Sequence, residues 1–226
     1  MTGDDQVTGI GAAPGPDRVP VADLDRATAA TAAGLLRPSC ASARWIERLV
    51  SGRPHETLPA LVAASDATIG ALGWPDIEQA LAAHPRIGDR TPSGAPGGGG
   101  PQPGAAAGGR PAPEAAAGGR PGPEAEAGGR PGPGPAGGDR EAAWSRQEQS
   151  GTRDAPADVQ AGLRAGNAAY EERFGHVFLI CATGMSAASM LAALHERLGH
   201  DPAAEREVVR DELTKIVRLR LGKAFA

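Results

Sequence analysis

The feature that most constrains the fold of this 226-residue chain is a tract built almost entirely from Gly, Pro, Ala, Arg and Glu, which runs from Thr91 to Arg140. Such a composition offers few side chains whose burial offsets the entropy lost when a backbone is ordered. A Gly-Gly-Arg-Pro unit recurs in it with a period too short for a solenoid repeat. We therefore expect residues 91–140 to form a disordered insertion, which a fold tolerates because loop-closure entropy grows slowly with length.

The sequence around the tract is long enough for one domain rather than two. Residues 21–90 and 141–226 together are predicted to form it, and the polar, Gly/Pro-rich residues 1–20 are predicted to be a disordered tail. Aromatic residues make up only 3% of the chain, and the 40% hydrophobic fraction consists mainly of Ala, Leu and Val. This mixture favours close helix packing, so the predicted class is all-α, a single compact multi-helix domain with a long insertion.

Charge and cysteine content exclude several kinds of partner and compartment. A formal net charge of −4 argues against overall attraction to nucleic acid or to an anionic membrane. The arginines of the tract are offset by acidic residues and no aromatic side chain lies between them, which disfavours RNA binding. We expect no membrane association, because no apolar run is long enough to span a bilayer. Cys40 and Cys181 form no disulfide framework and the first residues lack a secretory signal, so a cytoplasmic location is expected.

Apolar periodicity and capping residues predict the helices. Before the tract, helices are expected over residues 21–36, from a cap at Ser42 to Gly52, over 57–72, and in a short element that has Pro75 in its first turn and leads to His84. After the tract, a helix is predicted to start within 144–149, and others to cover 156–174, 186–198 and 202–221. Residues 177–182 form a short apolar run that favours a buried extended segment.

Four places can carry chemistry, and the first is His84, at the end of a helix and followed by Pro85. An imidazole with a pKa near 6.5 can donate or accept a proton at neutral pH. A histidine that merely interacts with the helix dipole is an equally good interpretation of this position.

The second place is Ser145 and Glu148, which are three residues apart and so share a helix face. They form either a capping box at a helix start or part of an active site. The third is the run Phe178–Ala182, whose side chains suit a core while its unpaired backbone could bind a planar polar ligand. The fourth is Arg220, which falls on the apolar face of the last helix and therefore needs a carboxylate such as Glu148 or an anionic ligand. Arg218 lies off that face and is expected to be solvated.

Metal-dependent and thiol chemistry are disfavoured. The five histidines show no paired ligand spacing, so no metal is expected. Cys181 lies within an apolar run that disfavours a reactive thiolate.

Taken in order, five segments resemble 2-oxo-4-hydroxy-4-carboxy-5-ureidoimidazoline (OHCU) decarboxylases: His84–Gly88, Ser145–Gly151, Asn167–Gly175, Phe178–Ala182 and Ile216–Leu221. The resemblance implies an all-helical enzyme, often a homodimer, that converts OHCU to (S)-allantoin and carbon dioxide in urate breakdown. It implies catalytic roles for His84, as proton donor, and for Glu148. The substrate contacts that it implies are Pro85, Ser145, Arg146, Gln147, Gln149, Phe178, Leu179, Ile180, Cys181, Ala182 and Arg220.

The chemistry of OHCU fits the absence of cofactor motifs, because a ring C=N beside the carboxylate-bearing carbon can accept the electron pair of the broken bond. No cofactor is therefore expected. The chain departs from the family in the tract itself, which replaces a short connection, and at His176-Val177, where phenylalanine-proline is usual. Two alternatives remain: a non-catalytic scaffold that uses the Gly/Arg tract, and a sibling enzyme acting on a related ureide.

Overall fold

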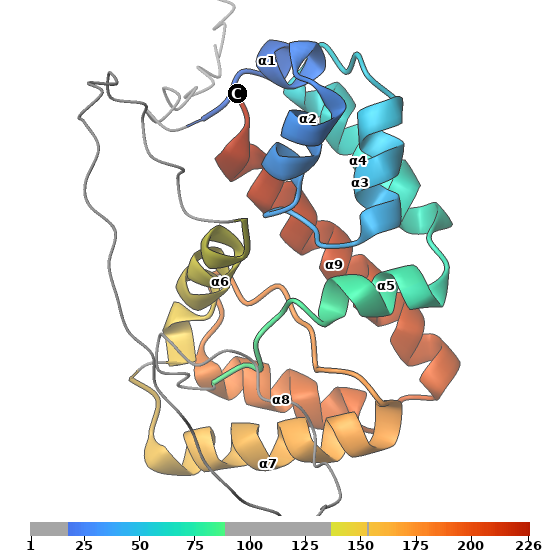
Figure 1. Ribbon diagram of the computed structural model, residues 1–226. Helices are drawn as coiled ribbons and strands as arrows, with labels where there is room; N and C mark the ends of the chain where they lie inside the picture. The colour runs from blue at the N-terminus through green and yellow to red at the C-terminus, as the bar shows by residue number, and fades with distance from the viewer. Residues whose placement is uncertain (1–17, 89–136, 153) are drawn as a thin grey trace, which may run out of the picture. The chain divides into compact units, whose positions relative to one another are not determined.

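The computed structural model describes residues 18–88, 137–152 and 154–226, and the predicted insertion up to residue 136 and most of the predicted tail lie outside them. Apart from a single β-bridge, the regular structure of the described residues is helical, which confirms the all-α prediction (Figure 1). None of the described helices is long and apolar enough to cross a bilayer. The helices are α1 (Val21–Arg26), α2 (Ala29–Leu36), α3 (Ala43–Ser51), α4 (Leu58–Ala71), α5 (Trp74–Leu81), α6 (Gly137–Glu148), α7 (Ala157–Phe174), α8 (Ala187–Arg197) and α9 (Pro202–Ala224), with a 3-10 turn η1 (Ser150–Thr152).

Hydroxyl caps start several helices where the sequence predicts them. Ser42 Oγ accepts the Trp45 N–H at 3.4 Å to begin α3, and Thr57 Oγ1 accepts the Ala60 N–H at 3.3 Å to begin α4. Each cap satisfies one of the N–H groups that the first turn leaves without a helical partner. At the C-terminus of α7, Gly175 ends the helix with a left-handed φ of 78°.

The prediction of one helix over residues 21–36 is wrong, because the chain forms α1 and α2 there. Ala27 is extended, with a ψ of 154°, and Thr28 then caps α2 by accepting the Thr31 N–H at 3.2 Å. The Thr28 hydroxyl bonds the backbone of the turn that follows it and so starts a new helix, which divides the run.

The position of α6 in the sequence also differs from the prediction. Residues 144–149 were expected to start a helix, but α6 begins at Gly137 and ends at Glu148. Ser145 and Glu148 therefore lie in its last turn, where a capping box is impossible because that motif belongs to an N-terminus.

The N-terminal residues of the described part join the fold. Val19 pairs with Phe225 in the single bridge, through Val19 N–H to Ala224 O at 2.8 Å and Ala226 N–H to Val19 O at 3.1 Å. Residues 18–20, which the sequence placed in the tail, are thus tied to the end of α9.

Two apolar clusters form the interior. The first joins α1–α5 to α9 and contains Trp45, whose indole N–H donates to Ser65 Oγ at 3.0 Å. The second joins α7 to α8, which lie side by side in Figure 1. A Cβ added at Gly166 would clash with Cδ2 of Leu194, so the missing side chain lets these two helices approach closely.

The extended segment runs from one cluster to the other. Leu179 belongs to the first cluster, whereas Phe178 and Ala182 belong to the second. Residues 177–182 are neither helical nor paired as a strand with any described residue. Because its side chains pack into both apolar clusters, the backbone of this segment is held between them.

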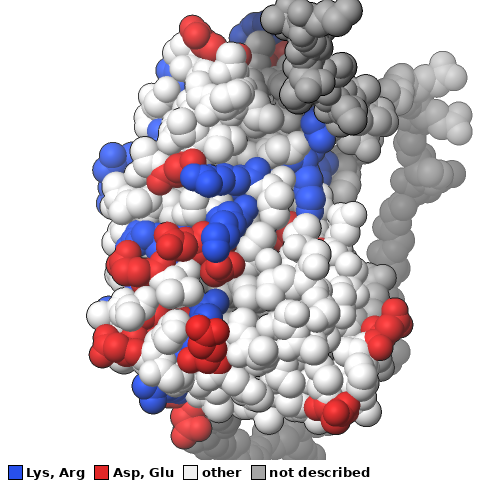
Figure 2. Space-filling view, turned by 180° about the vertical axis from the view of Figure 1, so that it is seen from behind, with Lys and Arg blue, Asp and Glu red and all other residues white. Residues whose placement is uncertain are grey.

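Charged side chains of both signs are mixed on the surface. The face in Figure 2 shows basic and acidic residues interleaved along one side and mostly uncharged residues over the rest. Neither sign forms a continuous patch on this face.

Candidate functional site

Most of the side chains predicted from the sequence line one small cavity, about 20 Å³ in volume, between the two apolar clusters. They come from the turn after α5, the last turn of α6, the extended segment and α9. This space is close to that of a single water molecule. The lining residues are His84, Pro85, Ile87, Ser145, Glu148, Gln149, Phe178, Leu179, Ile180, Ala182, Ile216 and Arg220.

His84 lies in the turn that follows α5, and the residue is only 9% exposed. Its backbone N–H donates to Leu81 O at 2.9 Å, and its ring Nδ1 bonds Ala80 O at the same distance. A carbonyl oxygen can only accept, so Nδ1 carries the hydrogen of the neutral ring. The other ring nitrogen, Nε2, is buried and bonds to no group within the described residues.

The surroundings of His84 keep its ring neutral. Burial disfavours the imidazolium, and the nearby Arg220 guanidinium repels it, so the pKa of His84 is lowered to about 4. Near neutral pH the Nε2 lone pair therefore faces the cavity as a hydrogen-bond acceptor. In this state His84 can donate a proton to a ligand only after taking one up.

Glu148 and Arg220 form a buried ion pair on one wall. Arg220 is fully buried and donates from Nη2 to Glu148 Oε2 at 3.0 Å and from Nε to Oε1 at 3.4 Å. Its Nη2 also donates to Ser145 Oγ at 2.8 Å. The prediction that Arg220 faces the interior and needs a carboxylate such as Glu148 is confirmed. Arg218, in contrast, is 54% exposed and pairs with Asp66 at the surface.

Lys223 is a further charged group of the site that the sequence analysis missed. Its Nζ donates to Glu148 Oε1 at 3.1 Å, and the side chain is 33% exposed. Arg220 and Lys223 thus carry two positive charges against the one carboxylate of Glu148. With His84 neutral, the balance of these four groups is positive, which favours an anionic ligand.

The backbone of the extended segment presents polar groups to the same cavity. Within the described residues, neither the N–H nor the C=O of Ile180 makes a hydrogen bond. Ile180 is partly exposed and lines the cavity, so this donor and acceptor are available to a ligand or to water.

Side chains of α7 and of Gln149, the residue after α6, hold the turn that carries His84. Asn167 Nδ2 donates to Ile87 O at 2.8 Å, and Gln149 Nε2 reaches Pro85 O at 3.4 Å. Arg86 and Glu171 form a two-bond ion pair, with both contacts at 2.5 Å. Asn167 and Glu171 lie one turn apart within the segment Asn167–Gly175, but no local sequence pattern indicates which residues they contact.

Two of the predicted site residues do not line the cavity, and the side chain of a third, Arg146, lies outside the described residues. Gln147 is exposed. Cys181 turns away, and burial together with nearby Glu212 raises the pKa of its thiol, which makes a thiolate nucleophile unfavourable. Within the described part of the chain, no cluster of His, Cys, Asp and Glu residues is arranged to hold a metal ion.

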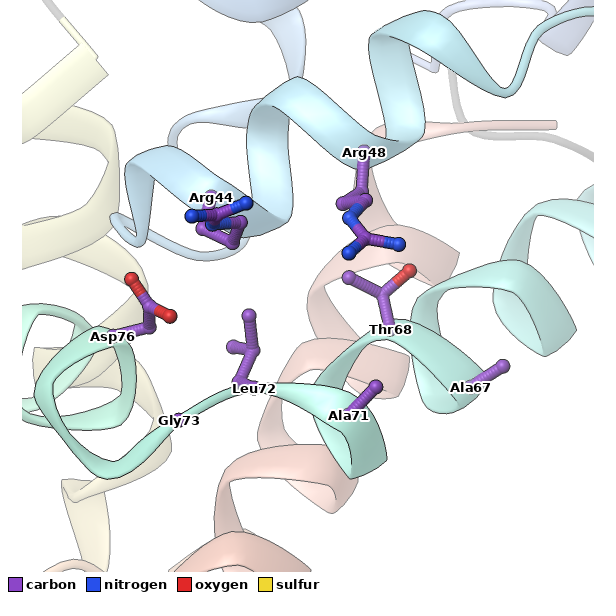
Figure 3. A pocket seen from close by; sticks show the side chains of 8 residues that line it. All are labelled: Arg44, Arg48, Ala67, Thr68, Ala71, Leu72, Gly73 and Asp76. Carbon is purple, nitrogen blue, oxygen red and sulfur yellow. The ribbon is translucent and has the colours of Figure 1, made fainter.

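A larger groove, of about 380 Å³, lies elsewhere on the molecule (Figure 3). Arg44 and Arg48 of α3 extend over one side of it, opposite Thr68 of α4 and Asp76 of α5. Both arginines are exposed, and the groove contains none of the predicted site residues. The small cavity, with its unpaired buried nitrogen and ion pair, remains the candidate site.

Comparison with known proteins points to one family. The family model described as OHCU decarboxylase matches residues 25–102 and 129–222, which is more than half of the chain. A 2-oxo-4-hydroxy-4-carboxy-5-ureidoimidazoline decarboxylase of Amia calva is 43% identical over 75 residues, 33% of this chain and 43% of that protein. The uric acid degradation bifunctional protein TTL of Arabidopsis thaliana is 43% identical over 60 residues, 26% of this chain and 18% of that protein. The aligned part thus spans less than half of either curated relative.

Solved structures share the fold. An OHCU decarboxylase crystallised in the presence of (S)-allantoin superposes with a TM-score of 0.55 and 22% identity, covering 83% of this chain and 94% of the other. An (S)-allantoin synthase superposes with a TM-score of 0.54 and 18% identity, covering 91% of this chain and 54% of the other. With the family model matching across the chain on both sides of the tract, this protein belongs to the OHCU decarboxylase family.

Proposed function

We propose that this protein decarboxylates OHCU to (S)-allantoin without a cofactor, with His84 as the proton-transfer group. One observation carries the proposal: the unpaired, buried Nε2 of His84 faces the cavity that the Arg220–Glu148 ion pair also lines. The names of the relatives agree with this assignment, and the excess positive charge at the cavity suits a substrate that carries a carboxylate.

The proton balance of the reaction fits a neutral histidine. By its name, OHCU bears a hydroxyl and a carboxyl on one ring carbon, C4, and a ureido group on the adjacent carbon, C5. When the C4–carboxyl bond breaks, carbon dioxide leaves and the electron pair moves into the C=N at C5. His84 Nε2 takes the hydroxyl proton, which leaves a carbonyl at C4. The resulting imidazolium delivers that proton to C5. The ring nitrogen that received the electron pair takes one further proton from solvent, which gives neutral allantoin.

The other groups of the cavity act as binding and orienting groups in this scheme. Arg220 and Lys223 attract the anionic substrate while they hold Glu148 in place. Glu148 accepts from N–H groups of the substrate, and the backbone of Ile180 bonds the ring edge. Delivery of the proton from one side only gives a single enantiomer, and general acid–base catalysis of this kind contributes about 10²- to 10⁴-fold in rate.

The direct test follows the reaction by circular dichroism. Urate oxidase and hydroxyisourate hydrolase generate OHCU in the cuvette, and this protein is then added. The expected result is rapid growth of the (S)-allantoin signal, whereas uncatalysed decay gives racemic allantoin and no signal. A trace that matches the sample without added protein would refute the proposed function.

We also propose a cytoplasmic location and a homodimeric assembly. Cys181 is a free thiol, which agrees with a reducing cytoplasm. A homodimer is implied only by the family resemblance. Light scattering of the purified protein tests it, and a monomer mass at micromolar concentration would rule it out.

A further inference from the structure

Two side chains outside the cavity hold the extended segment by its backbone. Arg197 of α8 donates from Nη1 to Leu179 O at 2.7 Å. Glu212 of α9 accepts the Cys181 N–H at Oε2, also at 2.7 Å. These are backbone contacts of residues two apart, made by two helices that flank the segment.

The spacing of these contacts determines which backbone groups remain for a ligand. In an extended chain, the N–H and C=O of residues i and i+2 point to the same edge, and those of residue i+1 point to the opposite edge. With Leu179 and Cys181 bonded along one edge, the N–H and C=O of Ile180 point to the other. Ile180 lines the cavity, whereas Cys181 does not.

We propose that Arg197 and Glu212 are positioning residues that present the Ile180 N–H and C=O as a donor–acceptor pair for the cyclic amide edge of the substrate. This inference rests on the proposed function for its ligand. An adjacent N–H and C=O on a ring match such a pair in two hydrogen bonds. Neither Arg197 nor Glu212 lines the cavity, so each acts through the backbone that it holds.

Arg197 is itself held firmly, as a positioning role requires. It is 5% exposed, and its Nε donates to Glu205 Oε1 at 2.9 Å. Glu205 is fully buried and also accepts from the Tyr170 hydroxyl and from His200 Nδ1. Burial opposes its ionisation, but the hydrogen bonds from Arg197, Tyr170 and His200 outweigh that cost, so the pKa of Glu205 is lowered.

Arg197 also contacts an aromatic ring of the extended segment. The Arg197 guanidinium lies 4.6 Å from the centroid of the Phe178 ring, a cation–π contact with a residue of the extended segment. One side chain thus contacts both the ring of Phe178 and the carbonyl of Leu179. Displacing this buried guanidinium would break several interactions at once and would therefore cost much free energy.

Glu212 provides the clean test, because it lies at the edge of the core with a side chain 13% exposed. Glu212→Leu removes the acceptor for the Cys181 N–H. Glu212→Gln keeps an acceptor oxygen while removing the charge. Glu207→Leu, at a residue of α9 that is 75% exposed, serves as the matched control.

Two measurements are made on these variants. Hydrogen exchange of the substrate-free protein reports the Cys181 amide, and steady-state kinetics on freshly generated OHCU report KM and kcat. Glu212→Leu is expected to speed exchange at Cys181 and to raise KM about tenfold or less, the range of one net hydrogen bond, with a smaller change in kcat. Glu212→Gln is expected to restore most of both values, and Glu207→Leu to match the wild type.

The two proposals fail in different ways. If Glu212→Leu leaves the Cys181 exchange rate and KM unchanged, the positioning role is wrong. A fall in kcat alone, or equal effects of Glu212→Gln and Glu212→Leu, also overturns it, since charge rather than the hydrogen bond would then matter. If the wild type does not turn over OHCU, the proposed function fails. The exchange data then decide separately whether Glu212 holds the segment.

Discussion

Arg220 and Glu148 lie 72 residues apart in the sequence, yet they meet in a two-point contact, Nη2 to Oε2 at 3.0 Å and Nε to Oε1 at 3.4 Å. The guanidinium is fully buried and the carboxylate nearly so. A pair of this kind is costly to break from one side, because the remaining charge stays buried without compensation. It therefore couples the last turn of α6 to α9 and shapes the cavity wall.

Arg220→Met should lower the free energy of unfolding by about 3–5 kcal/mol, because it leaves Glu148 with only the partly exposed Lys223. Urea denaturation measures this. The double variant Arg220→Met/Glu148→Gln should recover part of the loss, since the uncompensated carboxylate is gone. Arg218→Met, at an exposed pair, should change the value by less than about 1 kcal/mol. A loss at Arg220 no larger than that at Arg218 would contradict the buried-pair interpretation.

Lys223→Met should reduce kcat/KM by about three- to tenfold, with little change in stability, because one partly exposed contact to Glu148 is lost. Lys223→Arg should keep most of the activity. Arg164→Met removes the same charge from an exposed position of α7 and is the control for net charge. If Arg164→Met and Lys223→Met have equal effects, Lys223 acts only through the overall charge of the protein.

The stability of the protein should depend on pH through His84. Its pKa is lowered in the folded state to about 4, so between pH 6.5 and pH 4 the unfolded chain binds a proton that the folded protein does not. The stability that this gives is present above pH 6.5 and is lost as the pH falls towards 4. Between pH 7 and pH 5 the loss amounts to about 2 kcal/mol from this residue.

Comparing wild type with His84→Asn isolates this effect from the carboxylates, such as Glu205, which also lose stabilising interactions in acid. Urea denaturation at pH 7 and at pH 5 should show a smaller drop for the variant. An identical drop in both proteins would mean that His84 is not held neutral.

Replacing the tract between the two halves of the domain distinguishes an enzyme from a non-catalytic scaffold. Replacing residues 91–138 by a flexible Gly/Ser linker of similar length should leave kcat/KM for OHCU within about twofold, because every residue proposed to act lies outside that range. Such linkers impose no fixed geometry. If neither the wild type nor the linker variant turns over OHCU, and the variant also loses a binding partner, the scaffold alternative is favoured.

Local signals were sufficient for most of the helices. Caps such as Ser42 and Thr57 act within one turn, so the residues that define them are neighbours in the sequence. The buried position of Arg220 also followed from periodicity alone, because the apolar face of α9 is regular around it.

Other features depend on contacts that a single sequence does not reveal. The start of α6 lies in Gly-rich sequence, which hid the fact that Ser145 and Glu148 belong to a last turn. Helix α9 runs to Ala224 rather than to about Leu221, and these extra residues place Lys223 one turn beyond Arg220. The Arg86–Glu171 pair joins residues 85 positions apart, which no local pattern encodes.

The central claim is that Nε2 of His84 moves the proton, and His84→Ala tests it most directly in the circular dichroism assay with freshly generated OHCU. The variant should lose at least 100-fold in turnover, the lower end of general acid–base catalysis, while the exposed His195→Ala keeps wild-type activity. Both variants should retain the helical spectrum. Formation of (S)-allantoin by His84→Ala at close to the wild-type rate would contradict the account.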